Sequence, residues 1–162
     1  MSTAFEGSFT PYGTVFSCFM ASCLLGSTIF GQLVKKNVPT EKFTSAMLTV
    51  ATISMGIAAW ISTTGSVVGM PLAALVTAFF AFEGCVGMYF PSIGTLRSKY
   101  VPDSHRSVIM NLFGIPLNAL VVSVFLSIKK LGVSGALSVS TGALALATAS
   151  MMKLNSITKE SN

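Results

Sequence analysis

Five apolar stretches, each long enough to cross a bilayer as a helix, divide this sequence at regular intervals. They cover residues of about 13–34, 43–63, 67–90, 107–128 and 131–152, with short polar breaks between them. A helix rises about 1.5 Å per residue, so about 20 apolar residues cross the hydrocarbon layer of about 30 Å. The pattern predicts an all-α, polytopic membrane protein with a single membrane domain over residues 1–162.

The composition supports a chain whose main partner is the lipid bilayer. Hydrophobic residues make up 52% of the chain and charged residues only 9%. A water-soluble domain carries about a quarter charged residues, so this class of protein is excluded. Basic residues are not interleaved with aromatic ones, and nucleic acid is therefore not expected as a partner.

The basic residues are sorted between the two sides of the predicted membrane domain. Lys129 and Lys130 fall in the break after the fourth stretch, on one side. The other eight fall on the opposite side, and they are Lys35, Lys36, Lys42, Arg97, Lys99, Arg106, Lys153 and Lys159. Because Lys and Arg are retained on the cytoplasmic side of short loops, we expect the C-terminus in the cytosol and the N-terminus outside or in a lumen. The plasma membrane is preferred over an internal membrane.

The polar breaks predict the turns and loops between the spans. Thr63 to Ser66 forms a short outer turn, and residues 153–162 form a polar tail. Residues 91–107 form the longest break, a cytoplasmic loop that is ordered and contains a short helix.

Small residues at four-residue spacing indicate where the helices touch. Such stripes let two backbones approach closely. They comprise Ser22 and Gly26 in the first stretch, Ser54, Ala58 and Ser62 in the second, and Ser134, Ser138 and Gly142 in the fifth.

Glu83 is the one carboxylate inside an apolar stretch. A polar group that faces lipid costs several kcal/mol unless it pairs or lines water. Two interpretations remain open. Glu83 is either an acid of the substrate pathway or a structural partner of a neighbouring helix or of Arg97.

The fourth stretch carries a polar face. Ser107, Asn111, Gly114 and Asn118 lie within about 60° of one another on a helix that turns 100° per residue. Pro116 lies in the same stretch and is expected to kink the helix toward that face. Asn amides both donate and accept hydrogen bonds, so this face fits either a wet cavity wall or a contact between helices.

No enzymatic site is expected. His105 stands alone, and the sequence contains no metal-ligand spacing, no phosphate-binding glycine loop and no nucleophile beside a base. We therefore predict no catalytic residues, no metal ligands and no cofactors.

Three segments carry a resemblance to a known family. Residues 83–92 (EGCVGMYFPS), 96–102 (LRSKYVP) and 106–118 (RSVIMNLFGIPLN) resemble the C-terminal half of the molybdate-anion transporter family, also called major facilitator superfamily domain-containing protein 5. Residues 11–27 (PYGTVFSCFMASCLLGS) are similar to the eighth membrane helix of that family.

The resemblance implies a fold and a function. The five stretches would correspond to helices eight to twelve of a twelve-helix major facilitator, with molybdate or a related small oxyanion as substrate. Glu83, Ser107, Asn111 and Asn118 would face the substrate pathway, and Arg97, Lys99 and Arg106 would form a cytoplasmic gate or loop. Because the substrate lies between two halves, the missing N-terminal half or another membrane polypeptide becomes an expected partner.

One position departs from the family pattern. Gly114 stands where the family commonly has Arg, in the segment Phe113-Gly-Ile-Pro-Leu-Asn118. The departure removes a cation that would suit an oxyanion. The alternative function is a truncated, non-transporting membrane subunit or scaffold, in which the polar face is buried against a partner.

Overall fold

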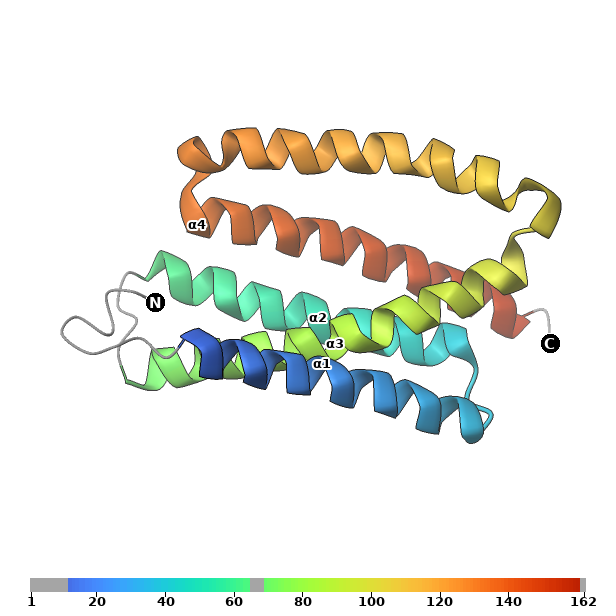
Figure 1. The fold of residues 1–162 in the computed structure, drawn as a ribbon, viewed down its shortest axis with the longest axis horizontal. Coiled ribbons are helices and arrows are strands. Elements are labelled where there is room, and N and C mark those ends of the chain that lie inside the picture. Colours follow the sequence, from blue (N-terminus) through green and yellow to red (C-terminus); the bar gives the residue numbers. More distant parts are fainter. Residues whose placement is uncertain (1–11, 65–68, 161–162) are drawn as a thin grey trace.

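The computed structural model describes residues 12–64 and 69–160. Its elements in chain order are the helices α1 (Tyr12–Lys35), α2 (Thr40–Thr63) and α3 (Met70–Tyr100), a 3-10 turn η2 (Asp103–His105), and α4 (Arg106–Glu160) (Figure 1). The prediction of an all-α membrane protein is confirmed. The predicted turn at residues 63–66 and the start of the stretch at 67 extend outside the described residues.

Helix α4 is folded back on itself at Gly132 and so supplies two membrane spans. Gly132 has φ 67° and ψ −178°, a backbone conformation that residues with a Cβ rarely adopt. We call residues 106–131 the first arm and residues 133–160 the second arm. With both arms counted, the described part of the chain holds five helical segments long and apolar enough to cross a membrane, which are Tyr12–Lys35, Thr40–Thr63, Met70–Tyr100, Asp103–Ser127 and Lys129–Lys159.

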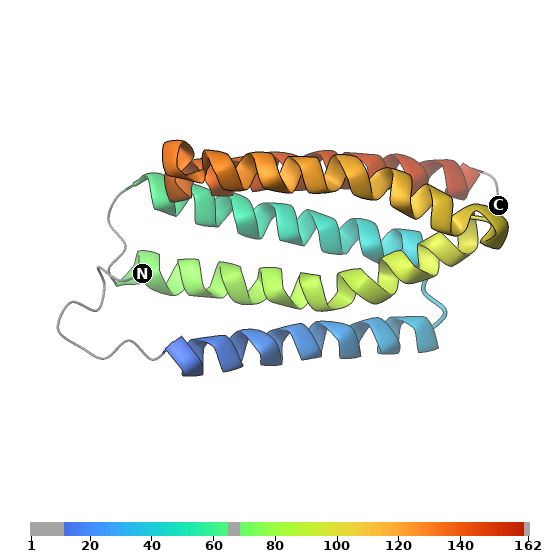
Figure 2. The same cartoon turned by 45° about the horizontal axis from the view of Figure 1, so that its top comes forward.

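Helix α2 lies at the centre of the bundle. It contacts α3 on one side and α4 on the other, while α1 contacts α3. Figure 1 shows the first arm of α4 at the outer edge, with its second arm beside α2, and in Figure 2 the two arms overlap above α2. Accordingly, 56% of an 18-residue apolar window of α2 is buried within the protein, whereas 0% of the corresponding window of the first arm is buried.

Helices α1 and α3 meet backbone to backbone through glycines. A Cβ at Gly26 of α1 would overlap the carbonyl oxygen of Gly84 in α3, and a Cβ at Gly87 would overlap the carbonyl oxygen of Cys23. Lipid tails are as apolar as the helix surface, so such close van der Waals contact is a main source of attraction between spans. The predicted role of Gly26 in packing is confirmed.

The second arm of α4 packs on α2 through a seven-residue repeat of small polar side chains. Ser134 donates to the carbonyl oxygen of Ser62 at 3.0 Å, and the hydroxyls of Thr148 and Thr52 lie 2.9 Å apart. Thr141, midway between Ser134 and Thr148, places its methyl group beside Gly56. These contacts run along the second half of α2, from Thr52 to Ser62.

Apolar residues alternate with these hydroxyls along the same edge. Leu137 packs against the buried cluster of Ala58, Ile61 and Leu75, while Leu144 and Met151 pack against the cluster of Met47, Leu48, Ala51 and Cys85. The combined spacing of three and four residues is that of a coiled-coil seam, which stays in register with a nearly parallel neighbour.

The predicted stripe of Ser134, Ser138 and Gly142 is therefore wrong beyond its first residue. Ser138 and Gly142 are exposed, and the Ser138 hydroxyl donates to the carbonyl oxygen of Ser134 in its own helix. A four-residue step advances 400° around the helix, so the stripe drifts about 40° per step away from α2.

The predicted break at residues 91–107 is too long. Helix α3 continues through Pro91 to Tyr100, so the link between α3 and α4 covers only Val101 to His105. Proline removes a single backbone hydrogen bond, and Ser92 and Leu96 beyond it are buried, which holds the extension in place. The predicted tail of residues 153–162 is helical through Glu160.

The glycine contact gives a direct test of how α1 is held. We expect Gly26→Ala to lower the free energy of unfolding by about 1–3 kcal/mol, because the added methyl group would push α1 away from the backbone of Gly84. Reversible unfolding in mixed micelles measures the change.

Gly31→Ala is the matched control on the same helix, because a Cβ at Gly31 meets nothing within 4 Å. Equal effects of the two substitutions would show that α1 does not pack on α3 through Gly26.

Candidate functional site

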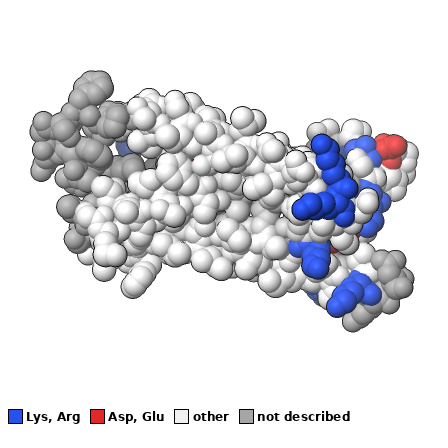
Figure 3. Space-filling model, turned by 90° about the horizontal axis from the view of Figure 1, so that it is seen from below, with Lys and Arg blue, Asp and Glu red and all other residues white. Residues whose placement is uncertain are grey.

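Charge is concentrated at one end of the bundle. Figure 3 shows Lys and Arg side chains gathered at the end where α1 and α3 finish and where α2 and α4 begin. We call this the cationic end. Successive spans run in opposite directions, so the basic residues between α1 and α2, at the end of α3 and at the end of the second arm of α4 fall at the same end.

A buried carboxylate organises the cationic end. The side chain of Glu41, in the first turn of α2, is 3% exposed. Its Oε1 accepts hydrogen bonds from the Nζ of Lys99 at 2.5 Å and from the hydroxyl of Tyr100 at 2.6 Å, both at the end of α3. The Tyr100 hydroxyl also lies 3.2 Å from the hydroxyl of Thr158 in the second arm of α4. Glu41 and Tyr100 together thus join three spans.

The predicted gate residues have different surroundings. Lys99 is half-exposed and paired with Glu41. Arg106 pairs with Asp103 across one turn and donates from Nη2 to the carbonyl oxygen of Val101 at 3.3 Å. Arg97 is exposed, and the structure shows no ion pair for it among residues 12–64 and 69–160. Arg106 therefore holds the α3–α4 link, Lys99 joins the end of α3 to α2, and Arg97 does neither.

Glu83 lies half-buried on α3. Its carboxylate makes no ion pair with Arg97 and no hydrogen bond to any residue that the structure describes. Gly84 and Gly87 on one side of it face α1, whereas Cys85 packs against α2. By helical spacing, Glu83 lies on the side of α3 away from α2.

The polar face of α4 lies on the first arm. Ser107, Asn111 and Asn118 are exposed, and Gly114 is partly covered. The helix runs through Pro116, which is exposed, and the non-helical backbone angle within α4 is at Gly132. Because α2 and the second arm lie between, the structure does not bring this face and Glu83 together (Figures 1 and 2).

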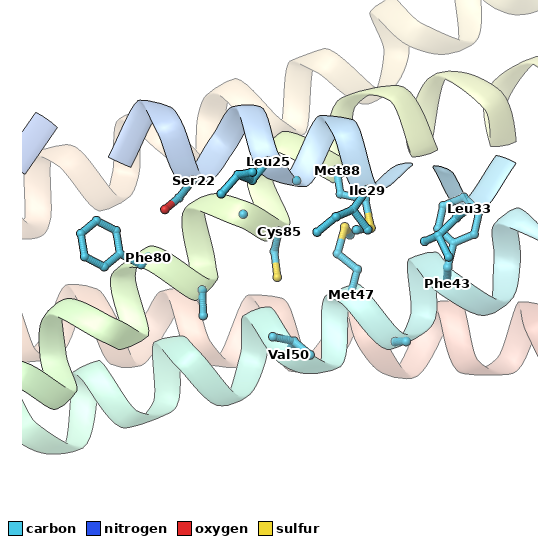
Figure 4. A pocket seen from close by; sticks show the side chains of 14 residues that line it. Ser22, Leu25, Ile29, Leu33, Phe43, Met47, Val50, Phe80, Cys85 and Met88 are labelled. Atoms are coloured by element: carbon cyan, nitrogen blue, oxygen red, sulfur yellow. The ribbon is translucent and has the colours of Figure 1, made fainter. Parts of the chain in front are cut away.

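An apolar groove, shown in Figure 4, lies between α1, α2 and α3. It has a volume of about 580 Å³, and its walls include Leu25, Phe43, Met47, Phe80 and Met88. Among the residues that the structure describes, none with a charged side chain lines the groove. The predicted site residues lie elsewhere.

Comparison with known proteins gives several molybdate-anion transporters as relatives. The chain is 30% identical to the molybdate-anion transporter of Takifugu rubripes over 112 residues, which are 68% of this chain and 23% of that protein. It is 29% identical to the molybdate-anion transporter of Xenopus tropicalis over 111 residues, covering 68% of this chain and 24% of that protein. The chain is a partial match to the molybdate-anion transporter family.

The match has a limited extent. The chain spans about a quarter of the length of the curated molybdate-anion transporters that it resembles. The transporter of Danio rerio, 30% identical over 111 residues, gives the same coverage of 68% and 23%. No family model matches the chain, and no solved structure matches it significantly.

Glu41 is the residue of the site that sequence reasoning missed. It stands in a polar break, two residues before the predicted second stretch, so it is not a carboxylate within an apolar stretch. A signal was present, since an acidic residue among three nearby lysines at a helix start invites an ion pair. The segments that resemble the molybdate-anion transporter family include Lys99 but not Glu41.

The geometry of the pair predicts an asymmetry between its two members. We expect Lys99→Met to destabilise the protein more than Glu41→Gln, because the first leaves a buried carboxylate without its cation. The second leaves a half-exposed ammonium group in contact with water, and the Gln amide can still accept from Tyr100. We further expect the double variant to be more stable than Lys99→Met alone.

The free energy of unfolding is measured in the same micelles for the wild-type protein, the two single variants and the double variant. Arg97→Met is the matched control, since it removes a cation from the same turn of α3 without breaking a described ion pair. Destabilisation by Arg97→Met as large as that by Lys99→Met would contradict the role of the pair.

Proposed function

We propose that this chain forms part of a membrane transporter for a small oxyanion, with molybdate as the first candidate substrate. The observation that carries the proposal is the match of 68% of the chain to proteins named as molybdate-anion transporters. The five membrane-spanning segments fit that class, and the named relatives are transporters rather than enzymes.

We propose that the cationic end faces the cytosol. Eight of the ten basic residues belong to this end, and basic residues in short loops are retained on the cytoplasmic side. The start of α1 and the Gly132 bend then lie outside or in a lumen. The plasma membrane is the proposed location.

The proposed substrate pathway includes Ser107, Asn111 and Asn118 on the first arm of α4. Hydroxyl and carboxamide groups donate hydrogen bonds to an oxyanion, and three such groups share one exposed face. Gly114 supplies no cation on this face, so the charge that balances the anion would come from another part of the transporter. Glu83 would then line a second part of the pathway, on the side of α3 that faces away from α2.

A covering partner is part of the proposal. Amide groups that face lipid cost several kcal/mol. None of the apolar window of the first arm is buried within this chain. The N-terminal half of a major facilitator, or another membrane polypeptide, would cover this face and close the pathway. At the cytosolic end, Lys99 and Arg106 would act as gate residues whose pairs with Glu41 and Asp103 exchange when the halves move.

The polar face can be tested by substitution. We expect Asn111→Leu with Asn118→Leu to reduce uptake of labelled molybdate at least tenfold while membrane insertion stays normal. The substitutions are made at the native locus. They are then present in any polypeptide that contains this sequence. Uptake by intact cells and quantity in membranes are measured together.

Ser123→Leu is the matched control, because Ser123 lies on the opposite face of the same arm and is also exposed. It should leave uptake unchanged. Unchanged uptake in the double variant would refute the pathway role. A different outcome would favour the alternative of a non-transporting subunit or scaffold. In that outcome neither the wild-type chain nor the double variant transports molybdate, and the double variant no longer assembles with a partner.

A further inference from the structure

A second hollow lies at the cationic end, between the start of α2 and the end of the second arm of α4. Its volume is about 340 Å³, and its lining residues are Pro39, Glu41, Lys42, Asn155, Thr158 and Lys159. We call it the basic cavity. It lies where two apolar spans end, at the level where lipid headgroups meet water.

The cavity has a net positive lining. Lys42 and Lys159 enter it from two different helices and are both exposed. The one carboxylate in the described lining, Glu41, is already bound to Lys99 and Tyr100. Its charge is therefore balanced from the side of α3, and the two lysines are left to attract an anion.

Neutral donors complete the lining. Asn155 is half-buried, and its carboxamide makes no hydrogen bond to any other residue that the structure describes. A carboxamide has two N–H donors in one plane, which suit neighbouring oxygens of a tetrahedral anion. The ammonium groups of two lysines add charge-assisted hydrogen bonds. The apolar groove between α1, α2 and α3 has none of these groups.

We propose that the basic cavity binds a phosphate group. Lys42 and Lys159 neutralise it, and Asn155 donates to one of its oxygens. Basic pockets between membrane helices at the headgroup level hold phosphorylated lipid headgroups, while soluble phosphate offers the same chemistry from the aqueous side. The proposal depends on the membrane fold and not on transport of molybdate, so binding can fail or hold independently of uptake.

The test uses the full chain, reconstituted in phosphatidylcholine nanodiscs. Affinity is measured by thermophoresis for two separate probes, a short-chain phosphatidylinositol 4-phosphate and inorganic phosphate. We expect Lys42→Gln with Lys159→Gln to weaken binding about 25-fold, from about fivefold for each lysine near an anionic group. Binding of the lipid alone identifies a headgroup site, and binding of both probes identifies a general phosphate site.

Lys35→Gln with Lys36→Gln is the matched control. It removes the same charge from the same end of the molecule, but neither residue lines the cavity. We expect it to change affinity less than threefold. Equal losses in the two double variants would mean diffuse surface attraction, and no loss in the cavity variant, or no binding of either probe, would equally overturn the proposal.

Asn155→Asp separates geometry from total positive charge. The side chain keeps its shape and both lysines remain, but a carboxylate replaces the donor group within the cavity. We expect affinity to fall at least fivefold with unchanged helix content by circular dichroism. Unchanged affinity would remove Asn155 from the site and contradict its assigned contact.

Discussion

The structure depends on the absence of water around the middle of each helix. A spanning segment must satisfy its backbone hydrogen bonds internally, so each one is helical, and charged groups collect at the helix ends. Helices in lipid gain little from hiding apolar surface, and they associate by close contact instead. The glycine contact between α1 and α3 and the hydroxyl seam between α2 and the second arm of α4 are two solutions to this requirement.

These two contacts explain why the bundle is unevenly filled. Helix α2 is covered on both sides. The first arm of α4 is attached through the Gly132 bend and the α3–α4 link, and none of its apolar window is buried within the protein. The predicted pathway residues lie on that uncovered arm and on the far side of α3. The groups that join several spans, Glu41, Lys99 and Tyr100, lie at the cationic end.

The sequence predicted the number of spans and the sorting of charge because both follow from composition over long windows. Prediction from the sequence was wrong where a single contact determines the local structure. Pro91 looked like a helix end, but burial of Ser92 and Leu96 carries α3 past it. The four-residue stripe in the fifth span is a local pattern, while the observed seam of Ser134, Thr141 and Thr148 requires knowledge of the angle at which α2 crosses it. Glu41 needed the position of Lys99, 58 residues away.

The account is tested most directly by the sidedness of the two ends. In a variant with Cys18, Cys23 and Cys85 replaced, single cysteines at Lys36 and Lys130 are labelled with a membrane-impermeant maleimide. Five spans with the cationic end in the cytosol predict labelling at position 130 in intact cells and at position 36 only after the membrane is opened. Labelling of both positions from the same side, or of position 36 in intact cells, would contradict the account.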